Sequence, residues 1–243
     1  MTTILSAQML LRATPICGSA DRANLTGALV EPIPDGGAWI VATTGQVMLI
    51  QRDRTASIAK PLVLRMTLSA QDERLLTDGE FGIAWSWDAA QIHIPDSVRE
   101  SPHACPVIWP GQRGTPRTHV IIEEACPATQ FPAKWRQAIG ASAPNIDPKR
   151  IPMWRYTGYN PALLDLLAGW SDGFRLRQRA PGKATIVSFD NEPDALGVIM
   201  PRAMYAEDAA NLRGMLTDLG HAGIADGLGL DADAAMAEKG GGA

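Results

Sequence analysis

The sequence lacks any long apolar run. Its apolar stretches stay well below the ~18 residues that a membrane-spanning helix requires, and its 243 residues begin with no basic segment followed by an apolar stretch. Both absences argue against a membrane or exported protein, so we expect a cytoplasmic protein without a membrane partner. At this length the chain can form one large domain or two ordinary ones.

Cysteine is scarce, with three residues and no pair in the CxxC spacing. The odd count argues against a disulfide framework and fits reduced thiols in the cytosol. His93, His103, Cys105 and His119 fall in one region, but no pair has the helical i, i+4 spacing or the zinc-ribbon pattern of a metal site. We therefore expect no metal and no other cofactor.

Catalytic motifs are also missing. The sequence contains no GxSxG nucleophile elbow, no Walker motif and no dinucleotide fingerprint. Glu123 and Glu124 are consecutive on an expected strand, where neighbouring residues face opposite sides, so they cannot share a substrate. The sequence therefore predicts a protein that is not an enzyme.

Excess charge is small, with a net charge of -4. Residues 206–243 hold seven acidic and two basic residues, so the rest of the chain is close to neutral. A near-neutral body argues against strong nucleic-acid binding through charge alone. The few aromatic residues include seven tryptophans, which we expect in the core or at a subunit interface and not in a stacking platform for single-stranded nucleic acid.

The C-terminal region differs from the rest of the chain. Its apolar residues at helical spacing predict one apolar helix face, which we expect to pack on the body or on a neighbouring subunit. These residues are Leu212, Met215, Leu216 and Leu219. The small, acidic and glycine-rich residues that follow predict a mobile tail.

What the sequence does contain is a recurring order of elements. Residues 1–53 predict a strand, a helix and three strands. Ser6 can cap the helix and Pro15 can end it. Gly45 permits a tight turn between the last two strands.

The same order recurs twice more. Residues 61–125 predict a strand, a helix beginning at Ser69, a hairpin and a last strand, with the proline- and glycine-rich residues 98–117 as loop. Residues 150–201 predict a strand, a helix capped by Asn160 and three strands. Three similar units predict an α+β fold with antiparallel sheets and short helices on one face.

Short segments resemble those of a known family. Ala42–Met48, ATTGQVM, is similar to the ATDGHRL segment of the bacterial sliding clamp, the β subunit of DNA polymerase III. Ile199–Arg202, IMPR, is similar to the VMPMR ending of that family, and Phe131-Pro132 to its FPDY-type segment. The Asp, His and Arg of the first pattern are replaced, and the chain is too short for three clamp domains. The resemblance therefore implies a shortened and diverged member.

The resemblance also implies a DNA-clamp-like domain organisation. Each clamp domain has two strand–helix–strand–strand–strand halves, with helices lining the DNA channel and sheets forming the outer wall. Residues 1–140 would form one such domain, residues 141–205 a second, truncated unit, and residues 206–243 the C-terminal helix and tail. Alternatively, residues 1–60 and 145–205 are the halves of one domain and the residues between them are an insertion.

Two binding surfaces follow from the resemblance. Apolar anchors of partner peptides would enter a pocket for which adaptable methionine side chains are suited. Its residues would be Thr43, Gly45, Met48, Val198, Met200 and Pro201. Bases on helices and linkers would face DNA phosphates. These are Arg12, Arg74, Lys149 and Arg150, whereas Arg175, Arg177 and Arg179 alternate on one strand and are expected on a solvated outer face.

The implied function is that of a DNA sliding-clamp-like processivity factor or replication scaffold, which acts by topology and peptide docking. Its partners would be double-stranded DNA bound without sequence preference, peptides of a DNA polymerase or clamp loader, and further copies of the chain. The alternative is a clamp-derived protein-interaction module of a phage or plasmid type that no longer closes a ring. An enzyme whose site leaves no motif is a third possibility.

Overall fold

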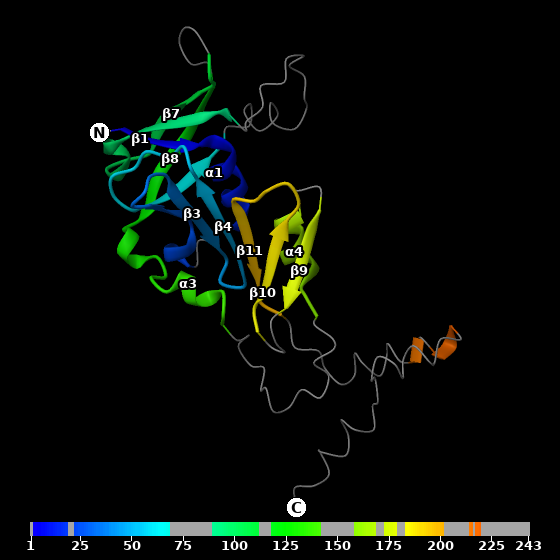
Figure 1. Cartoon of the computed structure of the whole chain (residues 1–243). Helices are drawn as coiled ribbons and strands as arrows, with labels where there is room; N and C mark the ends of the chain where they lie inside the picture. The colour runs from blue at the N-terminus through cyan, green and yellow to red at the C-terminus, as the bar shows by residue number, and fades with distance from the viewer. Residues whose placement is uncertain are drawn as a thin grey trace, which may run out of the picture.

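The computed structural model describes residues 2–18, 22–68, 89–111, 118–141, 158–168, 173–178, 183–201, 214–215 and 217–219. They form one 11-stranded antiparallel sheet in the order β1-β6-β7-β8-β5-β2-β3-β4-β11-β10-β9 (Figure 1). The strands are β1 Thr2–Ser6, β2 Ala28–Pro32, β3 Ala38–Thr43, β4 Val47–Asp53, β5 Leu62–Thr67, β6 Gln91–Pro95, β7 His103–Ile108, β8 Thr118–Cys126, β9 Phe174–Gln178, β10 Thr185–Phe189 and β11 Ala195–Ile199. The α-helices are α1 Ala7–Ala13, α3 Trp135–Ala138 and α4 Pro161–Ala168. Short 3-10 helices cover Thr14–Ile16, Ala23–Leu25, Asp96–Arg99 and Ala128–Gln130.

The sheet is built from three units with the same strand arrangement. Unit 1 ends in β2, β3 and β4, unit 2 in β6, β7 and β8, and unit 3 in β9, β10 and β11, and each set of three strands is consecutive in the sheet. Helix α1 precedes the three strands of unit 1, and α4 precedes those of unit 3. The predicted α+β fold of repeated units is therefore confirmed. The expected helix at Ser69, the first strand of the expected hairpin and most of the strand expected to begin the third unit lie outside the described residues.

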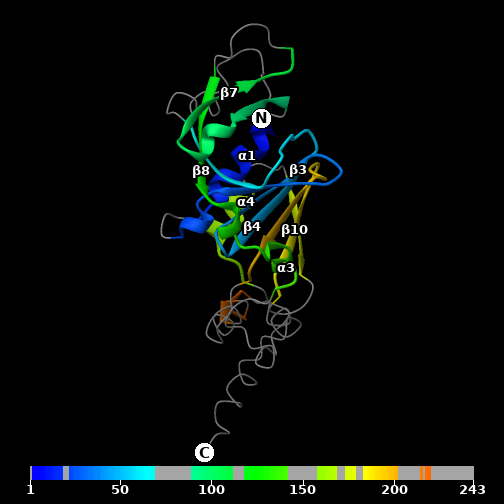
Figure 2. The same cartoon turned by 90° about the vertical axis from the view of Figure 1, so that its left-hand side faces the viewer.

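Units 1 and 2 each supply a strand that pairs with the other unit. Strand β1 of unit 1 pairs with β6 of unit 2, and β5 of unit 2 pairs with β2 of unit 1. Unit 3 joins the free side of unit 1, because β11 pairs with β4. Figure 2 shows β7 and β8 at the upper end of the molecule and β10 toward the lower end.

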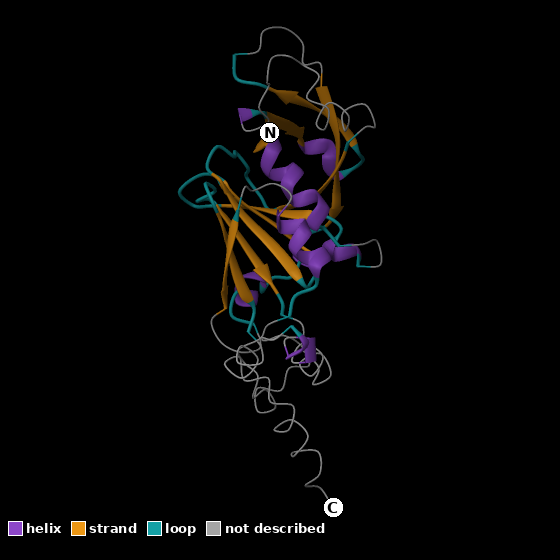
Figure 3. Ribbon diagram, turned by 90° about the vertical axis from the view of Figure 1, so that its right-hand side faces the viewer, coloured by secondary structure: helices purple, strands orange, loops and turns teal. Residues whose placement is uncertain are grey.

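Each face of the sheet has its own apolar core. The larger core includes Leu10 of α1 and Leu167 of α4, so both helices cover the same face, as Figure 3 shows. The core on the opposite face includes Phe131 and Trp135, which come from the segment after β8. Short helices therefore cover one face, as predicted, and among the described residues the segment after β8 covers part of the other.

The predicted helix caps are present. The Ser6 hydroxyl accepts a hydrogen bond from the Met9 N–H at 3.4 Å, which satisfies one free donor at the start of α1. Pro15 lies in the 3-10 helix that follows α1. At the other helix, the Asn160 side-chain oxygen accepts from the Ala162 N–H at 3.1 Å.

One sequence prediction is wrong. Residues 98–117 were expected as loop, but β7 lies within them and pairs with β8 over five residues. Its burial alternates, with Cys105 and Val107 inward, which is typical of a strand. Pro106 lies beyond the two residues that pair with β6, where a missing N–H is tolerated. The prolines and glycines of this stretch are typical of a loop, and they conceal the alternation in the sequence.

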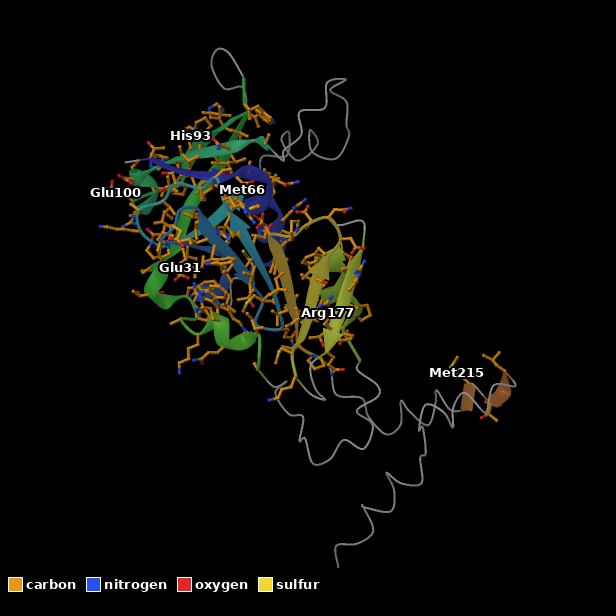
Figure 4. The ribbon with its side chains drawn as sticks, viewed as in Figure 1. Glu31, Met66, His93, Glu100, Arg177 and Met215 are labelled. Carbon is orange, nitrogen blue, oxygen red and sulfur yellow. The ribbon has the colours of Figure 1, made fainter. Side chains whose placement is uncertain are left out.

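The C-terminal helix also departs from expectation. Met215 and Leu219 are exposed large apolar residues, so they do not pack on the sheet as one of the two expected placements requires. Figure 4 shows Met215 well away from the sheet. Leu212 and Leu216 lie outside the part of the chain that the structure describes. Packing on a neighbouring subunit, the other expected placement, stays a prediction.

Candidate functional site

The two segments that carry the resemblance lie side by side. Strands β4 and β11 pair in a register that places Met48 opposite Val198 and Val47 opposite Ile199. Just beyond the paired strands, the Met200 N–H donates to the Gln46 carbonyl at 2.8 Å. Residues separated by about 150 positions in the sequence therefore lie on neighbouring strands of one sheet.

Two threonines shape the turn between β3 and β4. The Thr43 hydroxyl donates to the Val47 carbonyl at 2.7 Å and accepts from the Gly45 N–H at 2.9 Å. The Thr44 hydroxyl accepts from the N–H groups of Gln46 and Val47, both at 3.2 Å. Gly45 has a φ of 90°, which a residue with a side chain rarely adopts. Thr44 therefore provides the local acceptor that an Asp would provide in such a turn.

The predicted pocket residues differ in accessibility. Paired residues of antiparallel strands point to the same face, so Thr43, Met48 and Val198 share the face opposite α1 and α4. All three are buried, as is Pro201, whereas Met200 is half-buried and Gly45 is exposed. Among the six predicted pocket residues, Met200 and Gly45 are therefore the ones that solvent reaches.

A short segment after β8 covers the neighbouring part of this face. Trp135 of α3 belongs to the same apolar core as Met48 and Val198. Its indole N–H donates to the Glu31 carboxylate at 3.2 Å, and the Arg136 guanidinium lies 4.1 Å from the centroid of its ring. The Ala184 N–H donates to the Ala141 carbonyl at 2.8 Å, which joins the end of this segment to the start of β10.

Basic residues lie on the same face of the sheet, at its β9 edge. The row of paired residues that contains Met48 and Val198 continues through Ile186 of β10 to Arg177 of β9. Arg175 lies two residues away on the same side of β9, 3.5 Å from the Asp190 carboxylate. Both arginines are exposed, as expected for a solvated outer face, and Arg179 lies beyond the described part of β9.

Among the four bases predicted to face DNA, the structure describes Arg12 alone. Its guanidinium lies 2.6 Å from the Glu192 carboxylate, and the side chain is 11% exposed. This ion pair joins α1 to the turn between β10 and β11. The predicted positions Arg74, Lys149 and Arg150 fall in segments that the structure leaves undescribed.

The reactive groups in the described residues give no catalytic arrangement. Burial raises the pKa of the Cys17 thiol to about 12 and that of the Cys105 thiol to about 11, so both remain protonated near neutral pH. Burial, and then the charge of Glu124, also raises the pKa of Cys126. Within the described ranges, no three His, Cys, Asp or Glu side chains are grouped in a way that could bind a metal. No helix of the described residues has the length and apolar character that crossing a bilayer requires.

Two contacts at this site were not predicted as functional. Arg22 donates to the Thr44 carbonyl at 3.2 Å and so supports the turn from outside. Glu31 binds both Trp135 and Arg136, which fixes the covering segment to β2. Neither contact has a local signal in the sequence, because Arg22 lies 22 positions before Thr44 and Glu31 lies 104 positions before Trp135.

The sheet and its interlocked units define a protein of the DNA-clamp fold class, and solved bacterial sliding clamps share this fold. The DNA polymerase III subunit beta from Bartonella birtlesii, bound to griselimycin, matches with a TM-score of 0.50 at 13% identity, over 84% of this chain and 66% of that chain. The pol III beta of Caulobacter crescentus gives 0.48 at 12% identity, and a Pseudomonas aeruginosa sliding clamp with ligand gives 0.47 at 14%, with the same coverage. The predicted resemblance is thus confirmed for the fold, although the chain spans just under two thirds of each clamp. No protein-family model and no curated protein matches the sequence.

Proposed function

We propose that this protein is a clamp-like replication scaffold that docks partner peptides at the junction of β4 and β11. The observation that carries the proposal is the pairing of these strands, which joins the two clamp-like segments into one surface. The fold shared with bacterial sliding clamps supports it, and one of those clamps was solved with griselimycin bound. We further propose the division into a domain over residues 1–140 and a truncated unit over 141–205.

Docking at this junction would begin at Met200. Its side chain is half-buried, and its N–H bonds to the carbonyl of Gln46, the residue after the exposed Gly45, so an apolar anchor at Met200 would lie near this turn. An anchor that reaches Met48 or Val198 has to displace side chains that cover them, because both are buried. Methionine is unbranched and can change rotamer to admit such a group.

Binding of labelled griselimycin tests the docking site. We expect Met200→Asp to weaken binding by at least about tenfold, because a charge replaces the apolar contact of the anchor. The control is Met215→Asp, which makes the same change at an exposed methionine remote from the sheet. Equal binding by both variants, with both folded by circular dichroism, would remove the docking site from the proposal.

We also propose that the chain assembles into a ring on double-stranded DNA. Few basic residues are available for phosphate contact, so retention would come from topology and not from affinity. The protein, loaded by its host machinery, should then stay on nicked circular DNA and leave linear DNA of the same sequence. Equal retention on both molecules would contradict encirclement.

A specific observation favours the alternative of an interaction module without a ring. Arg12, the described base among those expected to face DNA, is held by Glu192 and nearly covered. A module of this kind would bind griselimycin through Met200 but show no preference for circular DNA. The two assays together therefore separate the scaffold from the module.

A further inference from the structure

One row of residues on the face opposite α1 and α4 places a tryptophan beside an arginine. Glu31 of β2 pairs with Trp39 of β3, and Trp39 pairs with Arg52 of β4. The Arg52 N–H donates to the Asp194 carbonyl at 2.8 Å, which continues the row to the residue before β11. Paired residues of antiparallel strands point to the same face, so Trp39 and Arg52 are neighbours on this surface.

Arg52 lacks the acceptor that a half-buried guanidinium requires. Its Nε atom is buried and has no hydrogen-bond partner in the described part of the chain. The pKa of Asp194 is lowered first by hydrogen bonds from Arg54 and last by the charge of Arg52, so Arg52 lies near this carboxylate. However, Arg54 already binds it through three hydrogen bonds. A buried donor without an acceptor costs free energy, so an anion from outside the chain would stabilise Arg52.

Half-buried apolar side chains flank Arg52 on both sides of β4. Trp39 lies opposite it on β3. On β11, Leu196 pairs with Ile50, which is two residues from Arg52 and on the same side of β4. Both Trp39 and Leu196 pack against the apolar core of this face. Tryptophan and arginine are the residues most enriched in interface hot spots, so this group has the composition of a binding surface.

The acids around this surface are already neutralised. Each of three carboxylates has its own arginine: the pairs are Glu31 with Arg136, Asp190 with Arg175 and Asp194 with Arg54. A run of nucleic-acid phosphates would meet these three carboxylates and be repelled. A single carboxylate fits better, because a rotamer change of Arg52 would let it accept from Nε and a terminal nitrogen together.

We propose that Arg52, flanked by Trp39 and Leu196, binds an acidic side chain of a partner peptide. The peptide would carry an apolar side chain on each side of the acid, to contact Trp39 and Leu196. Met200 lies at the other end of β11, about 20 Å away at the rise of an extended strand. The inference therefore goes beyond the proposed function, because it names a second surface and a different partner chemistry.

Fluorescence anisotropy with two labelled peptides tests the site. One peptide alternates glutamate and leucine, and its match has glutamine in place of each glutamate. We expect the wild-type chain to bind the glutamate peptide at least about tenfold more tightly, and Arg52→Gln to remove this preference. The control is Arg177→Gln, which removes the same charge at an exposed position of the same face and should keep the preference. No preference in the wild type, or the same loss in both variants, would overturn the proposal.

Nuclear magnetic resonance of the wild-type chain gives an independent readout if Arg52→Gln fails to fold. The indole N–H signal of Trp39 can be assigned with Trp39→Phe, because Trp39 is the residue opposite Arg52. It should shift when the glutamate peptide is added and stay in place with the glutamine peptide. Equal shifts with the two peptides, or no shift with either, would contradict carboxylate binding at Arg52.

Two further comparisons identify the ligand and separate the proposals. A labelled oligothymidylate should not distinguish the wild-type chain from Arg52→Gln. If its binding were lost in Arg52→Gln, the site would bind nucleic acid, and the peptide would be the wrong ligand. Met200→Asp should lose griselimycin and keep the glutamate peptide, and Arg52→Gln should do the reverse, so this inference and the proposed docking site fail separately.

Discussion

Asp53 is a buried acid that holds two parts of unit 1 together. Its carboxylate accepts from the Ser6 N–H at 2.6 Å, at the joint between β1 and α1. It also accepts from the N–H and the hydroxyl of Thr55, at 2.9 and 2.8 Å. Three donors compensate for burial of the charge, so the end of β4 is fixed to the start of α1.

Replacing Asp53 should be costly. We expect Asp53→Ala to lower the free energy of unfolding by about 3 kcal/mol, because it removes charge-assisted hydrogen bonds and leaves the buried Ser6 N–H without an acceptor. Urea denaturation gives this value. The control is Asp35→Ala, at an exposed position in the turn before β3, where we expect a change within about 0.5 kcal/mol. Similar losses for the two variants would show that Asp53 has no special role.

At the scale of elements, polar contacts support the pairing of β4 with β11. The Arg54 guanidinium donates two hydrogen bonds to one Asp194 carboxylate oxygen and one to the other, at 2.7, 3.1 and 2.9 Å. The Arg52 N–H donates to the Asp194 carbonyl at 2.8 Å. These bonds extend the junction past the last paired residues of the two strands.

The Arg54–Asp194 pair should make stability depend on pH. The hydrogen bonds from Arg54 lower the pKa of the Asp194 carboxyl below its ordinary value of 3.8. The pair therefore stabilises the fold above that value, and the contribution disappears as pH falls through the lower pKa of the folded state. We expect Asp194→Asn to be slightly less stable at pH 7 and equal to wild type at low pH or in high salt, measured by thermal unfolding. A difference that persists at low pH would assign the effect to the backbone and not to the charge.

Local chemistry accounts for the elements that the sequence predicted well. Ser6 and Asn160 cap helices through bonds within three residues, and the Gly45 turn is closed by its neighbours, so each is encoded where it occurs. Strand β7 was missed because its evidence is burial against β8 and β6, which the local proline content outweighed.

The resemblance predicts which residues the candidate site contains, but the sequence does not predict how accessible they are. The segments of the site were found by resemblance, and their contact depends on the β4–β11 pairing, which no local signal encodes. The burial of Met48 comes from a core shared with Trp135, and that of Arg12 from its pairing with Glu192. Both partners are distant in sequence, so a single sequence could not reveal them.

At the scale of the whole molecule, one apolar core joins all three units. It runs from Leu5 in β1, through Ile92 in β6, to Ile199 in β11 without interruption. A three-stranded unit with one short helix has too little core to be stable alone. Unit 3 should therefore fold together with units 1 and 2 and not as an independent domain.

A core substitution in unit 3 should accordingly destabilise the distant strands of unit 1. Leu167 of α4 is fully buried, so we expect Leu167→Ala to lower the free energy of unfolding by about 3 kcal/mol. Because the core is continuous, the hydrogen-exchange free energy of amides in β3 should fall by the same amount. The control is Leu219→Ala at an exposed position, which should leave these amides unchanged. The contrary result is that Leu167→Ala leaves exchange in β3 unaffected while amides of β10 lose protection. Unit 3 would then unfold independently, and the pairing of β4 with β11 would join two separately stable parts of the chain.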